Sequence, residues 1–156
     1  MKKQHWYFAG AALLTILIMG ASKAFIKPTK SGIKRIKDAM GEGHYGASRG
    51  NRKHMGIDFV TVPGEPIFAP ISGKVTALPY AASDLVHRGV EIVSGVEEHQ
   101  LFYIKPIVRV GQTVVQGQII GYADNIKNKY GALMTNHVHH EVKQNGKFID
   151  PTKKYA

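Results

Sequence analysis

From Gly43 onward, short runs of β-forming residues alternate with turn-forming Gly, Pro and Asn, and this alternation constrains the fold more than any other feature. Turn sequences recur at hairpin spacing: Pro63-Gly64, Ser72-Gly73, Val110-Gly111-Gln112, Gln116-Gly117-Gln118 and Asn145-Gly146. The predicted strands are Gly56–Val62, Pro66–Ala69, Gly73–Leu78, Gly89–Ser94, Gln100–Ile104, Thr113–Val115, Ile119–Ala123 and His137–Lys143. No segment of helical length and period interrupts them, so the sequence predicts one small antiparallel all-β domain over residues 43–156.

Two counts limit what this domain can do. A chain of 156 residues has the length of one domain plus an appendage. It contains no cysteine, which excludes a disulfide-stapled fold, a Cys-ligated zinc finger and thiol catalysis. Any metal site must therefore be built from histidine nitrogen and carboxylate oxygen.

Positive charge is concentrated in the first third of the chain. The formal net charge is +10, and residues 1–53 hold 11 Lys and Arg against Asp38 and Glu42, a net of +9. The rest of the chain is close to neutral and shows no basic stripe interleaved with aromatic residues. A nucleic-acid-binding domain would carry its positive field across the folded surface, so we predict no nucleic-acid partner.

The amino-terminal segment, residues 1–22, is typical of a membrane-directed sequence. Lys2 and Lys3 precede an uncharged run whose apolar part is slightly shorter than the ~20 residues that span a bilayer core. Bulky Ile18 and Met19 near its end favour an uncleaved anchor helix, whereas Ser22 and Ala24 are small enough for a cleaved secretory signal. The sequence leaves both interpretations open.

Residues 23–42 form a basic segment that we interpret as a juxtamembrane linker or a short helix. In the helical alternative, Ile33, Ile36 and Met40 share one face and contact lipid or protein. Because most cations follow the apolar run, the positive-inside rule favours a cytoplasmic domain. The chemistry argued next requires the opposite side of the membrane, so the orientation also stays open.

Histidine and aspartate occur in two groups whose spacing suits a metal site. The first is His54-Met55-Gly56-Ile57-Asp58, in which His54 and Asp58 can share a face. The second is His137-Val138-His139-His140-Glu141 on a predicted strand, where His137 and His139 project to one side. Three nitrogen and oxygen ligands with one open position are typical of a catalytic zinc site. His54, Asp58 and one histidine of the later pair would supply these ligands, and the other histidine would stand beside the metal.

A larger set of motifs resembles the lysostaphin/LytM-type zinc metallopeptidases. The matching segments, in order, are Tyr45–Arg49, His54–Phe59, Pro63–Pro70, Gly73–Val75, Val110–Val114, Gly117–Gly121, His137–Val142, Asn145–Lys147 and Asp150-Pro151. This resemblance spans about residues 43–152 and implies a duplicated hybrid motif, a small antiparallel β-sheet of the split-barrel kind. It also implies a zinc ion, with His54, Asp58 and His139 as the ligands and His137 as the catalytic histidine.

One departure from the family pattern concerns a second catalytic histidine. The family usually carries it in a Tyr-x-His-Leu strand, where this chain has Leu101-Phe102-Tyr103-Ile104-Lys105-Pro106. Tyr103 and Lys105 are the two candidates to replace it. The same segment resembles the leukocyte cell-derived chemotaxin branch, which keeps the zinc site and is not regarded as an active peptidase.

These inferences lead to two hypotheses about function. The first is a membrane-tethered zinc metalloendopeptidase that hydrolyses peptide cross-links of peptidoglycan and faces the periplasm or cell wall, in a bacterial envelope or a phage virion membrane. The second is a zinc-binding module without catalysis that binds peptidoglycan or a protein partner. The sequence predicts neither the cross-link that is cut nor the oligomeric state.

Overall fold

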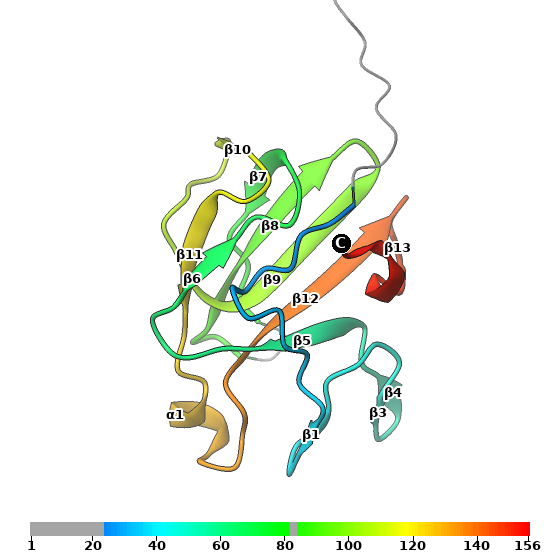
Figure 1. The fold of residues 1–156 in the computed structure, drawn as a ribbon, viewed down its shortest axis with the longest axis vertical. Coiled ribbons are helices and arrows are strands. Elements are labelled where there is room, and N and C mark those ends of the chain that lie inside the picture. The colour runs from blue at the N-terminus through cyan, green and yellow to red at the C-terminus, as the bar shows by residue number, and fades with distance from the viewer. Residues whose placement is uncertain (1–23, 82–83) are drawn as a thin grey trace, which may run out of the picture.

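The computed structural model describes residues 24–81 and 84–156, and its main element is a nine-stranded antiparallel β-sheet (Figure 1). Two small hairpins precede it, β1 (Lys37–Asp38) with β2 (Gly41–Glu42) and β3 (Ser48–Arg49) with β4 (Arg52–Lys53). The sheet consists of β5 (Gly56–Val60), β6 (Pro66–Phe68), β7 (Gly73–Ala77), β8 (Arg88–Ser94), β9 (Glu97–Pro106), β10 (Thr113–Val114), β11 (Ile119–Ala123), β12 (His137–Gln144) and β13 (Lys147–Phe148). Two short helical turns complete the described chain, α1 (Lys127–Tyr130) and a 3₁₀ turn at Thr152–Lys154.

All eight predicted strands are present, and the predicted antiparallel all-β class is confirmed. Most boundaries lie within two residues of the prediction. The exception is β9, which begins three residues earlier and ends two residues later than expected, because its first part pairs with β8 and its last residues pair with β11. His99, which precedes the predicted strand Gln100–Ile104, consequently lies inside β9 and is fully buried.

Strand β9 is the branch point of the sheet. Residues Glu97–Phe102 pair with β12, whereas Ile104–Pro106 pair with β11. On its other side β9 pairs with β8, with a register shift between Arg88 and Gly89. The sheet therefore divides at Tyr103, and the two arms share one core made of inward-facing residues such as Leu101, Ile104 and Val138.

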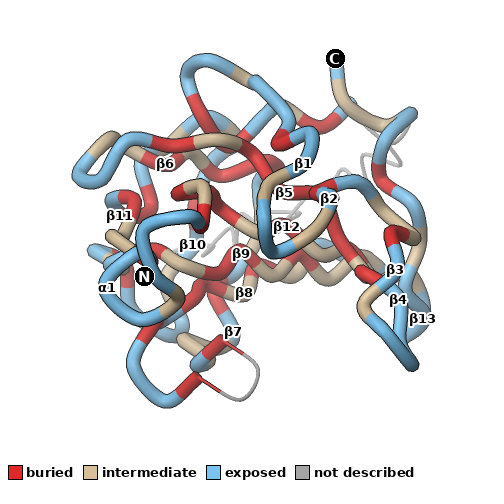
Figure 2. The backbone as a smooth tube through the Cα atoms, turned by 90° about the horizontal axis from the view of Figure 1, so that it is seen from below, coloured by how far each residue is buried: buried red, intermediate tan, exposed pale blue. Residues whose placement is uncertain are grey.

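Burial follows the strand period of two that the sequence shows. Along β12, Val138 and Val142 face the core, while His137 and His139 face a pocket on the opposite side. Figure 2 shows buried residues gathered along the central strands, while α1 and the hairpin tips are exposed. The alternation thus places apolar residues on one face and the candidate metal ligands on the other.

Residues 24–42 pack onto the folded domain, which corrects the prediction of a linker or short helix over residues 23–42. Phe25 is completely buried and packs edge-on against His99 and Tyr155. Lys34 forms a bridge with Phe59 of β5, flanked by hydrogen bonds from Arg35 N to Asp58 O and from Val60 N to Ile33 O, both 2.8 Å. Residues 27–42, all of which the structure describes, contain no helix, because residues 33–35 pair with the edge of β5 and residues 37–42 form the hairpin of β1 and β2.

The predicted membrane segment, residues 1–22, lies outside the described residues. Within residues 24–81 and 84–156, no helix has the length and apolar character needed to cross a bilayer.

Beneath β12, three polar side chains form a buried chain of hydrogen bonds. Tyr155 Oη lies 2.5 Å from His140 Nδ1, and His140 Nε2 lies 3.0 Å from His99 Nδ1. Burial lowers the pKa of His99 to about 3, and it also lowers that of His140. Both imidazoles are therefore neutral near pH 7, and protonating either one in the folded protein costs free energy because the charge would be buried.

This buried pair predicts a stability that falls in acid. Between about pH 6.5 and pH 3 the unfolded chain binds a proton at His99 that the folded chain does not, so the free energy of unfolding decreases as the pH falls. From pH 7 to pH 4.5 the loss attributable to His99 is about 2–3 kcal/mol. Urea unfolding in EDTA should show His99→Asn losing less stability over this interval than the parent. An equal loss in both proteins would contradict the assignment, and His44→Asn, an exposed histidine, is the matched control.

Candidate metal centre and active site

Pairing of β5 with β12 brings two of the predicted ligands face to face. Asp58 and His139 are direct partners in the antiparallel register, so their side chains lie on the same side of the sheet. His54 lies two residues before β5 and reaches the same point. Gly56 allows this approach, because a Cβ there would lie 2.7 Å from His139 Cε1 and 2.5 Å from the carbonyl oxygen of His140.

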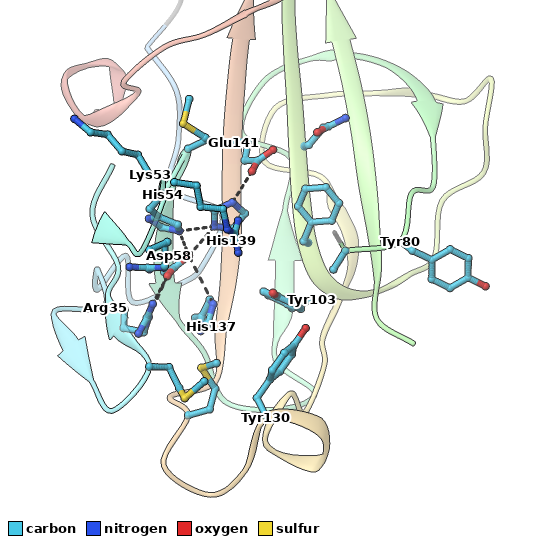
Figure 3. Close-up of a pocket in the computed structure, with 18 of the residues that line it drawn as sticks. Arg35, Lys53, His54, Asp58, Tyr80, Tyr103, Tyr130, His137, His139 and Glu141 are labelled. Atoms are coloured by element: carbon cyan, nitrogen blue, oxygen red, sulfur yellow. Dashed lines mark hydrogen bonds and ion pairs between the residues drawn. The ribbon is translucent and has the colours of Figure 1, made fainter. Parts of the chain in front are cut away.

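Three ligand atoms of these side chains form a tight triangle (Figure 3). His54 Nε2 lies 3.1 Å from Asp58 Oδ1, His139 Nδ1 lies 2.8 Å from the same oxygen, and the two nitrogens are 2.9 Å apart. Two imidazoles and one carboxylate are a donor set that Zn²⁺ takes in proteins. The chemistry of these donors therefore fits zinc.

Each of the three side chains is oriented by a further contact on its far side. His54 Nδ1 donates to the carbonyl oxygen of His44 at 2.8 Å, which leaves Nε2 facing the triangle. His139 Nε2 lies 2.9 Å from Glu141 Oε1, which leaves Nδ1 facing it. Such outer contacts fix the tautomer and ring orientation of metal-binding histidines.

Asp58 is held by Arg35, a residue from the segment before β1. Arg35 donates from Nε and Nη2 to Asp58 Oδ2 at 3.0 and 2.6 Å, and it also contacts Asp38 and the carbonyl oxygen of Gly41. Both Arg35 and Asp58 are buried. Because both hydrogen bonds end on Oδ2, Oδ1 of Asp58 is left directed toward the two histidines.

The charges of the cluster are strongly coupled. Burial alone would raise the pKa of Asp58, but His137, His139 and His54 lower it well below its ordinary value. For His139, burial acts to lower the pKa, and the hydrogen bonds to Asp58 and Glu141 outweigh it and raise the pKa to about 9. In the metal-free protein His139 is therefore protonated near pH 7, and metal binding has to displace that proton.

His137 lies beside the triangle and is not one of its three corners. Its Nδ1 lies 2.7 Å from the carbonyl oxygen of Thr135 and donates to it, so the second nitrogen, Nε2, carries the lone pair. Nε2 lies 3.6 Å from Asp58 Oδ1 and lines the same pocket. Burial lowers the pKa of His137, which keeps it neutral and able to accept a proton near pH 7.

The pocket around these residues has a volume of about 530 Å³. Its floor is formed by β9 and β12. Figure 3 shows Lys53 on one side of the pocket and Tyr80, Tyr103 and Tyr130 on the other. Arg49 and Arg52 also line the pocket. A peptide-sized ligand could lie between these walls and above His137 and His139.

The two sequence candidates for the absent second imidazole differ in position. Tyr103 lines the pocket, and its ring lies edge-on to that of His137 with centroids 5.2 Å apart. The Lys105 side chain is 72% exposed, lies 3.5 Å from Asp124 and does not line the pocket. His87, His99 and His140 are buried elsewhere in the described chain.

Sequence reasoning missed two residues that hold the ligands. Glu141 follows His139 by two positions on one strand, so the strand period could have placed both on the same face. Arg35 had no such indication, because 23 residues separate it from Asp58 and its neighbours have the composition of a solvated linker.

Comparisons with known proteins show which family the chain is similar to. A family model described as Peptidase family M23 matches residues 52–151. Leukocyte cell-derived chemotaxin-2 of Bos taurus is 30% identical over 144 residues, which cover 91% of this chain and 92% of that protein. Peptidoglycan DD-endopeptidase ShyB of Vibrio cholerae is 34% identical over 103 residues, which cover 64% of this chain and 22% of the longer relative.

The fold itself has been seen in solved structures. The antimicrobial peptidase lysostaphin from Staphylococcus simulans is similar with a TM-score of 0.62 over 86% of this chain and 54% of that chain, at 23% identity. At that identity the likeness establishes the architecture alone. With a family model that covers residues 52–151 and a relative that is similar over nearly its whole length, the chain belongs to peptidase family M23.

Proposed function

We propose that this protein is a membrane-tethered zinc metalloendopeptidase that hydrolyses peptide cross-links of bacterial peptidoglycan. The observation that carries the proposal is the arrangement of His54, Asp58 and His139, with ligand atoms within 3.1 Å of one another and His137 beside them. The similarity of residues in this domain to a peptidoglycan DD-endopeptidase supports the choice of substrate.

In this proposal each residue of the site has a distinct task. His54, Asp58 and His139 would hold zinc, which, when bound, polarises a peptide carbonyl and lowers the pKa of water toward ~7. His137 Nε2 takes a proton from the attacking water, since Thr135 fixes its tautomer and burial keeps it neutral. Arg35 and Glu141 keep two of the ligands in place.

A second candidate function is a zinc-stabilised module that binds peptidoglycan or a protein partner without cleaving it. Two observations favour it. The chain is similar to a chemotaxin over 91% of its length. Apart from the ligands His54 and His139, His137 is the only histidine among the described residues that line the pocket. In that case the pocket would bind its ligand and His137 would be dispensable.

The proposal includes tethering by the amino-terminal segment. The apolar run between Gln4 and Ser22 supports an anchor, and a substrate in the cell wall supports a domain that faces the periplasm or wall. A bacterial envelope and a phage virion membrane are both compatible with this arrangement.

The decisive experiment uses the full chain, loaded with zinc, on purified peptidoglycan sacculi. We expect soluble muropeptides to be released, the release to stop in EDTA and with His139→Ala, and added zinc to restore the EDTA-treated parent. In a separate experiment, the full chain should sediment with the membranes when the cells that produce it are fractionated. Binding to sacculi without any release, with zinc retained, would replace the peptidase by the binding module.

A further inference from the structure

Tyr103 has a backbone conformation that is rarely adopted by a bulky residue. Its φ is 67°, and the only other non-glycine residue with positive φ in the described chain is Asn145, in a turn. Tyr103 is the bulged residue at the branch of β9, between Phe102, which pairs with β12, and Ile104, which pairs with β11. A left-handed conformation costs free energy at such a residue, and strain of this kind tends to persist at functional sites.

The bulge aims the side chain of Tyr103 into the pocket. In a regular strand, alternation would turn Tyr103 away from the face used by Phe102, yet both residues line the pocket. Gly89 makes room for this arrangement, because a Cβ there would lie 2.8 Å from the Phe102 ring. Figure 3 shows His137 between Asp58 on one side and Tyr103 on the other.

A second tyrosine beside Tyr103 is fixed by a buried carboxylate. Tyr130 Oη donates to Asp84 Oδ2 at 2.8 Å, and the rings of Tyr103 and Tyr130 meet edge-on at 6.0 Å. Asp84 is completely buried and also accepts hydrogen bonds from Lys129 Nζ at 2.8 Å and His87 Nδ1 at 2.5 Å. Backbone N–H groups of Val86 and His87 complete its partners at 2.8 and 3.2 Å.

These bonds determine what the two hydroxyl groups can do. Tyr130 has one hydroxyl hydrogen, and Asp84 accepts it, so the Tyr130 oxygen can act only as an acceptor toward the pocket. Tyr103 keeps its own hydrogen for a ligand oxygen or for Tyr130. Burial raises the pKa of Tyr103, so the phenol stays protonated and able to donate at neutral pH.

We propose that Tyr103 is a catalytic residue that replaces the absent second imidazole by donating a hydrogen bond to the carbonyl oxygen of the bound peptide as negative charge develops on it. The proton stays on Tyr103 throughout. Tyr130, anchored by Asp84, is a positioning residue that holds the Tyr103 ring against His137. The inference rests on the proposed peptidase function, because it concerns the same pocket.

The test uses the full chain with zinc and two readouts. The first is kcat on muropeptide dimers. The second is calorimetric binding of a phosphinic analogue of N-acetyl-alanyl-alanine amide, in which the peptide link is replaced by a tetrahedral PO₂⁻–CH₂ group. Loss of one oxyanion donor typically costs ~10²–10³ in rate, so we expect Tyr103→Phe to lower kcat by that factor and to weaken phosphinate binding by at least about 10-fold. KM, zinc content and melting temperature should stay close to those of the parent.

Further variants separate catalysis from structure. Tyr103→His should recover part of the lost rate, because histidine tolerates a left-handed backbone and again supplies a donor. Tyr130→Phe should reduce kcat less than Tyr103→Phe, and the double variant should be no slower than Tyr103→Phe alone. Lys105→Ala and Tyr122→Phe, on exposed side chains outside the pocket, are matched controls that should leave both readouts unchanged.

The outcomes distinguish this inference from the proposed function. If the parent cleaves muropeptides and Tyr103→Phe changes kcat and phosphinate affinity by less than about threefold, the role of Tyr103 is overturned and the peptidase stands. If the parent cleaves nothing but binds the phosphinate in a Tyr103-dependent way, the donor role is supported and the peptidase fails. If the parent neither cleaves nor binds, both are overturned.

Discussion

Replacing His137 by alanine is expected to lower the turnover of peptidoglycan by about 10²–10⁴-fold, the range for removal of a general acid–base group. The physical reason is the position of Nε2, which faces the pocket 3.6 Å from Asp58 Oδ1. The hydrogen bond from Nδ1 to Thr135 leaves the lone pair on Nε2, and burial lowers the pKa of the ring so that it stays neutral. His137 is outside the ligand triangle, so the zinc content should remain close to one ion per chain.

The measurement combines initial rates of muropeptide release with metal analysis of the same samples. His44→Ala is the matched control, because the His44 side chain is 61% exposed and only its backbone carbonyl oxygen contacts His54. Loss of zinc together with loss of activity in His137→Ala would contradict the separate role given to this residue. Full release of muropeptides by His137→Ala would show that His137 is not the general base of the reaction.

Replacing Arg35 by methionine is expected to destabilise the metal-free protein by about 3–5 kcal/mol, the usual cost of removing one partner of a buried ion pair. Asp58 would then keep its buried Oδ2 without the two hydrogen bonds that Arg35 donates at 3.0 and 2.6 Å. Because the carboxylate would lose its fixed orientation, zinc affinity should also fall by about 10–100-fold.

Urea unfolding in EDTA and competition with a zinc chelator measure the two effects. Arg35→Lys should have an intermediate effect, because an ammonium group keeps the charge but lacks the planar pair of N–H donors that both reach Asp58 Oδ2. Arg109→Met, at an exposed position, is the matched control and should change neither quantity measurably. Unaltered stability in Arg35→Met would contradict a stabilising role for the buried ion pair between Arg35 and Asp58.

The period of two in the sequence determined most of the fold. On β12, Val138 and Val142 lie on one face and His137 and His139 on the other, so the strand packs with the valine face against the core. The glycine and proline turns limited the lengths of the strands between them, which is why all eight were predicted near their observed positions. The candidate ligands were predictable for the same reason, since His54, Asp58, His137 and His139 belong to two short local patterns.

Tertiary structure decided which distant residues support these patterns. Arg35 reaches Asp58 only because residues 33–35 pair with the edge of β5, and strand pairing at that separation leaves no local periodicity in a basic segment. Tyr103 faces His137 only because β9 bulges where its partner changes from β12 to β11. Both features depend on the register between strands that are far apart in the chain, and this register exists only in the assembled sheet. The spacing of residues in the sequence predicts only which side chains share a face of one strand.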